Sequence, residues 1–253
     1  MLATFYQACN AIAPEAFKLM SALLDTWQVD ALSHNWVMPD NFHVNIKVMQ
    51  TKETRIEVDE LGHSTFTTYV KVNQGSKKGL ANVANTIHSI DGYLLRSVIR
   101  RASFDKVKVQ KALDLILSTG ATFYEQDEVC DPELQNMLNI YQYSGMLDVS
   151  IIDYIKPSNI GYVPKDLLYK LVAKLKKMQE LGSSPVLTVH DAFRAHPNHC
   201  NVVRYWYKEL MAELAESDIL QFIVSQIVKQ EVKFVKKSNN LADKIRGCNY
   251  AIC

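Results

Sequence analysis

The sequence lacks the features that would place it in a membrane or in an oxidising compartment. No apolar run reaches the roughly 18 residues that a membrane-spanning helix needs, and the amino end has no basic region followed by an apolar block. The 5 cysteines are scattered, odd in number and free of any Cys-x-x-Cys pair. They therefore indicate neither a disulfide framework nor a zinc site. These absences predict a cytoplasmic protein that does not contact membranes.

The motifs of several common enzyme classes are also absent. The chain has no glycine-rich phosphate loop, no Gly-x-Ser-x-Gly elbow and no His-Glu-x-x-His pair, so it gives no support to the enzymes that use them. With 28 basic and 27 acidic residues the formal net charge is +1. Neutrality neither predicts nor excludes nucleic-acid binding, because local clustering of Lys and Arg decides it. Such clusters occur at 96–111 and 170–177.

Periodicity divides the first part of the chain into helix and sheet. Apolar residues recur with helical spacing up to Trp27, which indicates a packed helical entry, and Pro14 either opens a second helix or kinks a single one. Residues 35–73 alternate between apolar and polar types, as half-buried strands do, with a glycine-containing loop at 59–64. We therefore expect an antiparallel sheet over 35–73 that includes a hairpin.

Helical spacing returns after residue 80 and continues through a block at 104–184 that carries no recognisable motif. Arg96 and Arg100 share a helix face, which is either a solvated basic face or a phosphate-contacting one. The sequence then predicts a short strand at 185–190, a turn over 192–199 and a long helix from about Cys200.

The short strand ends at His190 and Asp191, where a turn would expose a carboxylate to a metal ion. A His-Asp dipeptide alone is weak evidence for a metal site, since most such dipeptides serve as turns or caps. A two-metal site needs a second carboxylate. We interpret Asp40, Asp59 and Asp91 as surface or capping acids, so this chain offers no obvious second acid.

Three segments in a fixed order resemble the carboxy-terminal part of the single-subunit, bacteriophage-type RNA polymerases. They are Trp36-Val-Met-Pro39-Asp40-Asn-Phe42 with Gln50-Thr-Lys-Glu-Thr-Arg55, then Asn85-Thr-Ile-His88-Ser-Ile-Asp91-Gly92-Tyr-Leu-Leu-Arg96, then Val189-His190-Asp191-Ala-Phe193. The end, Asn249-Tyr250-Ala-Ile252-Cys253, also resembles the family's terminus, which finishes near the active site.

The resemblance implies an α+β fold, a polymerase palm with an antiparallel sheet and surrounding helices. It divides the chain into a fingers and palm segment at 1–103, an inserted helical subdomain at 104–184, and the palm motif strand, long helix and docked end at 185–253. By the same resemblance Asp191 is a catalytic aspartate that holds Mg²⁺, with His190 beside it and His88 near the nascent base pair or the incoming ribose. Residues expected near nucleotide or nucleic acid are Asn85, Asp91, Arg96, Tyr250 and Cys253.

The sequence departs from the family in two respects. The 104–184 block replaces a short connection, and the earlier family motifs, the first catalytic aspartate and the nucleotide-gripping fingers helix, would precede Met1. We therefore expect a split DNA-directed RNA polymerase in the cytoplasm of an infected bacterial host. Its second subunit would supply those motifs, and its ligands would be DNA template, RNA product, nucleoside triphosphates and a shared pair of Mg²⁺ ions.

Other functions stay open on the residues alone. A fragment of an A-family DNA polymerase shares the Val-His-Asp turn, although there Glu usually follows where this chain has Ala192-Phe193. A His-Asp phosphohydrolase would need further spaced metal ligands. A non-catalytic scaffold that binds nucleic acid or another subunit would not depend on Asp191.

Overall fold

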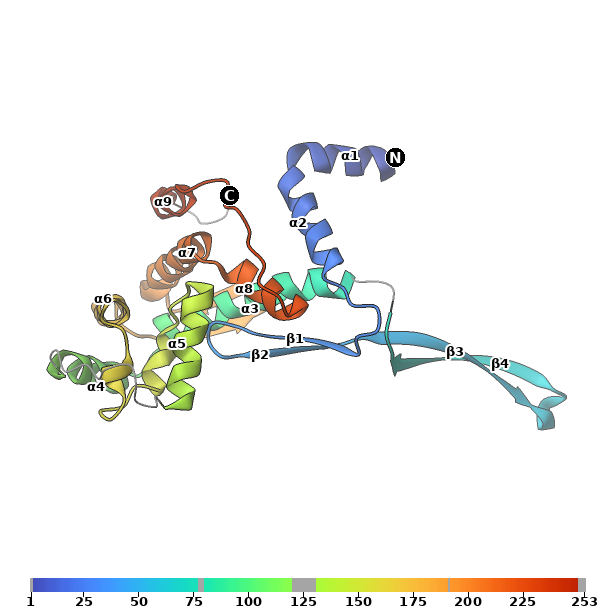
Figure 1. The fold of residues 1–253 in the computed structure, drawn as a ribbon, viewed down its shortest axis with the longest axis horizontal. Helices are drawn as coiled ribbons and strands as arrows, with labels where there is room; N and C mark the ends of the chain where they lie inside the picture. Colours follow the sequence, from blue (N-terminus) through green and yellow to red (C-terminus); the bar gives the residue numbers. More distant parts are fainter. Residues whose placement is uncertain (1, 77–79, 120–130, 191, 250–253) are drawn as a thin grey trace. The chain divides into compact units, whose positions relative to one another are not determined.

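The structure, a computed structural model, describes residues 2–76, 80–119, 131–190 and 192–249. These residues form helices and strands, which confirms the mixed α+β prediction (Figure 1). The helices are α1 (Leu2–Ile12), α2 (Pro14–Asp25), α3 (Leu80–Ala102), α4 (Lys106–Ser118), α5 (Pro132–Ser144), α6 (Lys165–Leu181), α7 (Cys200–Glu216), α8 (Ile219–Val228) and α9 (Leu241–Gly247). The strands are β1 (Ser33–Val37), β2 (His43–Lys47), β3 (Met49–Val58), β4 (Ser64–Asn73), β5 (Val186–Val189) and β6 (Ala192–Ala195). Short 3-10 turns are η1 (Asp59–Leu61), η2 (Val149–Asp153), η3 (Ile160–Tyr162) and η4 (Pro197–His199).

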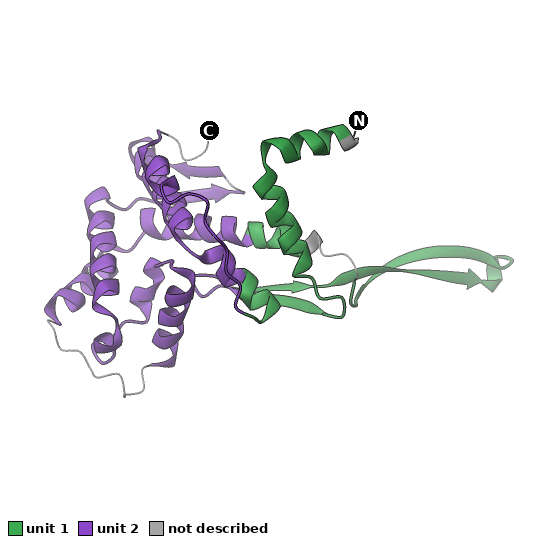
Figure 2. Ribbon diagram, turned by 45° about the horizontal axis from the view of Figure 1, so that its top comes forward, with its two compact units in different colours: residues 1–36, 43–88, 224–230 green, residues 37–42, 89–223, 231–253 purple. Residues whose placement is uncertain are grey.

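The chain divides into two compact units (Figure 2). Unit 1 comprises residues 1–36, 43–88 and 224–230, and unit 2 comprises residues 37–42, 89–223 and 231–253. The division falls within α3, after His88, and it leaves the whole 104–184 block inside unit 2.

Unit 1 begins with two helices that meet at a proline. Pro14 occupies the first turn of α2, where its missing amide hydrogen costs nothing, so the two-helix alternative is confirmed. The expected packing of α1 is wrong, because Phe5 is 64% exposed and Ile12 is 85% exposed. An edge-to-face contact between Tyr6 and Phe17, with ring centroids 6.4 Å apart, joins α1 to α2.

The strands of unit 1 form two separate pairs, where the sequence predicted one sheet. β1 pairs with β2, and β3 pairs antiparallel with β4 along ten residues, from Met49 opposite Asn73 to Val58 opposite Ser64. Gly62 adopts φ 64° in the connecting loop, as the predicted hairpin requires. Alternation shows which side chains share a face of a strand, but it does not show which strand lies beside it.

Unit 2 is built on helices whose ends the sequence marks clearly. Pro132 opens α5 after the capping carboxylate of Asp131, and Gly145 closes it at φ 69°. Along α6, Leu167, Leu171 and Leu175 recur every four residues and are 0% exposed. Burying each of them contributes about 2 kcal/mol before entropy is counted. The predicted helices of the 104–184 block are thereby confirmed.

Within these described ranges, no helix combines the length and the apolar character that crossing a bilayer demands.

Candidate functional site

The predicted catalytic His-Asp dipeptide begins in the connection between the two strands of a short hairpin in unit 2. β5 and β6 are antiparallel, and their register pairs Val189 with Ala192, so the connection starts at His190. His190 has φ 55° and an exposed side chain, a left-handed conformation that two-residue hairpin connections favour. Asp191, the next residue, lies outside the described residues.

The strand β6 replaces part of the turn that the sequence predicted over 192–199. The segment is extended because it pairs with β5, a contact that a four-residue pattern cannot reveal. Phe193 then packs edge to face on Tyr207 of α7, with ring centroids 5.9 Å apart, and Val186 is buried. The hairpin is therefore supported from both of its strands.

Helix α3 carries four of the residues predicted to lie near nucleotide. Asn85 and His88 belong to unit 1, whereas Asp91 and Arg96 belong to unit 2 with the hairpin. His88 and Asp91 are exposed, and Asn85 is half-buried. The exposed Asp91 agrees with its interpretation as a surface acid.

Arg96 is bound to the turn that follows β1. Its Nε and Nη2 donate to Oδ2 and Oδ1 of Asp40 at 2.7 and 3.0 Å, and its guanidinium lies 4.1 Å from the centre of the Phe42 ring. The side chain of Asp40 is only 3% exposed, so its interpretation as a surface or capping acid is wrong. An arginine 56 residues further along the chain neutralises it, and no local pattern indicates that pairing.

Arg100 extends this ion pair into a buried network. Its Nη2 donates to Oδ2 of Asp40 and to Oδ2 of Asp148, both at 2.9 Å. Asp148 has a fully buried side chain and also accepts from Ser97 Oγ at 2.6 Å. Burial opposes ionisation of Asp148, but the charge and hydrogen bonds of Arg100 outweigh it and lower the pKa of this carboxyl. The face shared by Arg96 and Arg100 is thus charge-matched, and the freely solvated alternative is wrong.

A second buried cluster surrounds Glu213 of α7. Arg101, which is 0% exposed, donates from Nη1 and Nη2 to the two carboxylate oxygens at 2.9 and 2.8 Å. Lys174 of α6 also donates to this carboxylate. Burial and the neighbouring charge of Arg101 lower the pKa of Lys174 to about 8. The middle of the predicted basic cluster at 170–177 is therefore an internal ion pair.

Sequence reasoning missed both acids at the centre of these networks. Asp148 had a weak local signal, because it precedes η2 and accepts from the amide of Ser150 at 2.9 Å, as a capping aspartate does. Glu213 had none, since its partners lie 112 and 39 residues away in the chain.

The end of the chain packs on α7 as far as the structure describes it. Arg246 of α9 donates to Glu209 of α7 at 2.9 Å. Lys208 of α7 donates to the carbonyl of Cys248 at 3.2 Å, and Arg204 donates to that of Asn249 at 3.0 Å. Tyr250 and Cys253, which were predicted to lie near nucleotide, fall outside the described residues.

A scan against protein-family models finds no match, and no curated protein matches the sequence.

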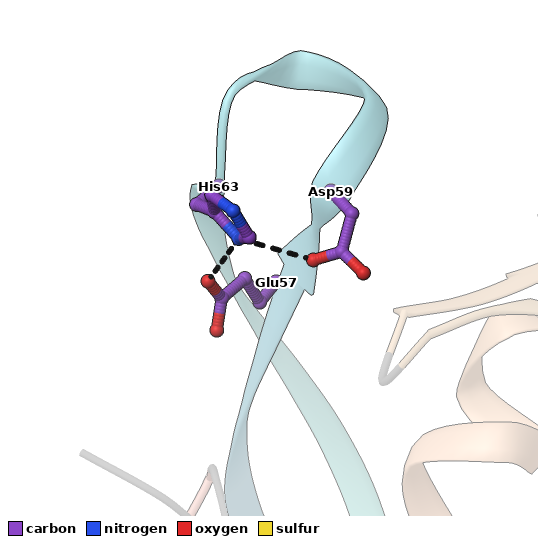
Figure 3. A group of neighbouring side chains, drawn as sticks. All are labelled: Glu57, Asp59 and His63. Carbon is purple, nitrogen blue, oxygen red and sulfur yellow. Dashed lines mark hydrogen bonds and ion pairs between the residues drawn. The ribbon is translucent and has the colours of Figure 1, made fainter.

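Within the described ranges, one group of three metal-ligating side chains lies close together, and it is in unit 1. Nδ1 of His63 lies 3.0 Å from Oε1 of Glu57 and 3.2 Å from Oδ1 of Asp59, at the loop between β3 and β4 (Figure 3). The three side chains are 56–79% exposed, and the contacts of the His63 ring with the two carboxylates account for the geometry without an ion. This group is not the predicted Mg²⁺ site.

The described geometry of unit 2 therefore offers a supported hairpin with an exposed His190 and two buried ion-pair networks. Asp40 and Asp148 share Arg100, and Asp40 also binds Arg96. A carboxylate whose lone pairs are used in this way is a poor ligand for a further cation. If a metal binds beside the hairpin, the ligands that complete its site come from outside these networks.

Proposed function

We propose that this chain is the carboxy-terminal, palm-bearing subunit of a split DNA-directed RNA polymerase of the single-subunit bacteriophage type. The main support is the β5–β6 hairpin. Its strands pair up to Val189, and His190 opens the connection with an exposed side chain at φ 55°. A hairpin held by its own strand pairing and by the contact of Phe193 with Tyr207 gives the kind of support that a metal-ligating carboxylate requires.

In this proposal Asp191 holds one side of a pair of magnesium ions, which would supply the charge that activates the RNA 3′-hydroxyl and neutralises the triphosphate. A single carboxylate does not complete such a site. Asp40 and Asp148 are committed to arginines, so a second chain supplies the first aspartate together with the fingers. His190 lies beside Asp191 in the connection, and His88 is assigned to the nascent base pair or incoming ribose.

Reconstitution tests this assignment. The chain is mixed with the candidate partner subunit, single-stranded DNA template, Mg²⁺ and all four ribonucleoside triphosphates, and RNA synthesis is compared for wild type and Asp191→Asn. We expect the variant to lose roughly a thousandfold in rate, because one charge that compensates the metal pair is gone. Asp166→Asn is the matched control, since Asp166 is an exposed acid on α6, and its rate should stay unchanged.

Parallel reactions with deoxyribonucleoside triphosphates, and a phosphatase assay of the chain alone, separate the alternatives. Preference for deoxyribonucleotides would assign the chain to the A-family DNA polymerases, and phosphatase activity without a partner would assign it to the His-Asp phosphohydrolases. Partner binding with synthesis that does not depend on Asp191 would leave a scaffold. Full synthesis by this chain alone would also refute the proposal.

A further inference from the structure

The outward side of α6 in unit 2 carries more basic than acidic side chains. We call this surface the α6 face, and its charged residues are Lys165, Asp166, Lys170, Lys176, Lys177 and Glu180. Lys174 is not among them, because its ammonium pairs with Glu213 between the helices. Four lysines against two acids give the α6 face a net charge of +2. The basic cluster at 170–177 therefore has an exposed part besides its internal ion pair.

Acidic side chains of the neighbouring helix α7 do not cancel this charge. Glu213 is paired with Arg101 as well as with Lys174. Glu209 is paired with Arg246 at 2.9 Å. Each of these carboxylates already faces at least one cation, so the net positive charge of the α6 face remains available to a ligand.

An exposed aromatic ring lies among the lysines of the α6 face. Tyr169 is 74% exposed, and it comes four residues after Lys165 and seven before Lys176. The three side chains fall within roughly 40° of one another around the helix axis. They span roughly 16 Å along it, the length of about five stacked nucleotides. A ring flanked by cations on one line of a helix is thus presented to solvent.

Two further tyrosines position lysines at the border of the α6 face. The ammonium of Lys170 donates to the hydroxyl of Tyr141 of α5 at 2.9 Å. That of Lys177 lies 5.4 Å from the centre of the Tyr205 ring of α7. Both of these rings are half-buried and occupied by a lysine, so Tyr169 is the ring that a ligand can cover.

We propose that the α6 face binds a single strand of nucleic acid, with a base stacked on Tyr169 and phosphates held by Lys165 and Lys176. A partner protein is disfavoured, because along α6, which the structure describes in full, the only aliphatic group that is exposed is the methyl of Ala173. The proposal gives the 104–184 block a strand-binding role. It goes beyond the polymerase activity and does not depend on it, since this binding needs neither a metal ion nor a second chain.

Fluorescence anisotropy tests the proposal with the full chain and labelled oligothymidylate or oligouridylate of about 12 nucleotides, without Mg²⁺. The strand that binds more tightly identifies the sugar. Tyr169→Ala should weaken binding about tenfold, because one stacking contact is lost. Tyr169→Phe keeps the ring and should bind as wild type does. Lys176→Met should reduce the slope of log affinity against log salt concentration by about 0.7, since one phosphate contact fewer releases counterions.

Tyr143→Ala and Lys244→Met are the matched controls, and both should bind as wild type does. Tyr143 is a 64% exposed tyrosine of α5, and Lys244 is an exposed lysine of α9. Thermal melts check that every variant is folded. Ultraviolet crosslinking of a bromouracil-substituted strand should label the tryptic peptide of residues 166–170, which contains Tyr169.

Four results would overturn the proposal. They are crosslinks found only in other peptides, equal losses for Tyr143→Ala and Tyr169→Ala, duplex DNA that binds as tightly as the single strand, and a polyglutamate peptide that does so. The last result would assign the α6 face to an acidic protein instead. None of them bears on RNA synthesis with the partner subunit, so the two proposals fail separately.

Discussion

Replacing Asp148 with Asn should loosen the part of unit 2 that surrounds the end of α3. The substitution removes the charge that Arg100 meets at 2.9 Å in a fully buried position. Breaking a buried ion pair from one side costs about 3–5 kcal/mol. Arg100 keeps Asp40 as a partner and is itself 28% exposed, so we expect the lower end, about 3 kcal/mol.

This loss should depend on pH in a defined direction. Burial works against the charged form of Asp148, but Arg100 and the hydrogen bonds of Ser97 and Ser150 lower its pKa below that of the unfolded chain. A depressed pKa contributes stability that is present above the unfolded value of about 3.9 and is lost as the pH falls below it. The difference between wild type and Asp148→Asn should therefore shrink below about pH 4.

Hydrogen exchange measured by mass spectrometry reports on this region without assuming that both units unfold together. If Asp148→Asn lowers the free energy of local unfolding by about 3 kcal/mol, amides in residues 93–102 and 146–153 should exchange roughly a hundredfold faster at pH 7. Asp91→Asn is the control, because Asp91 is an exposed acid of the same helix. Its effect should stay within about 0.5 kcal/mol. If the Asp148 variant matched the control, the network would not stabilise this region.

The remaining predictions concern Lys174 and His190. Because the pKa of Lys174 is lowered to about 8 in the folded chain, the unfolded chain binds more protons between about pH 8 and 10. In urea unfolding, the unfolding free energy of wild type should rise relative to that of Lys174→Met by up to about 1.4 kcal/mol per pH unit in this range. Lys176→Met, which replaces an exposed lysine of the same helix, is the control, and its unfolding free energy should follow that of wild type with pH. A difference between wild type and Lys174→Met that does not change with pH would contradict the pKa shift. His190→Gly should raise the unfolding free energy by about 1 kcal/mol, because glycine adopts φ 55° without a Cβ penalty; a decrease would show that the ring itself stabilises the hairpin.

The sequence allows the helices of this protein to be predicted well because their signals are local. Pro14 and Pro132 open helices, and Gly145 closes one at a left-handed φ, and each acts within a few residues of its own position. The loop between β3 and β4 is equally local, since Gly62 supplies the conformation that it needs. These features follow from backbone sterics alone.

The candidate site could be predicted only in part, because its supports join distant segments. The His190 connection follows from a strand and a turn signal, but β6 becomes a strand only through its pairing with β5. Asp40 resembled a turn acid because its neighbour is Pro39, whereas its partners Arg96 and Arg100 come 56 and 60 residues later. One sequence carries no record of such pairs, so charge matching in the interior appeared only in the structure.

The long pair of strands in unit 1 has a consequence for how the protein behaves in concentrated solution. In the ranges that the structure describes, β3 and β4 pair with no strand other than each other, so their outer edges can accept a strand from another molecule. Phe66 and Val70 are about half exposed, and charges such as Lys52 and Lys71 provide the repulsion that discourages such growth. Salt shortens the range of that repulsion. This ribbon is therefore a surface at which concentrated protein can associate, and a substitution that removes its lysines should lower the yield of soluble protein before it alters any chemistry.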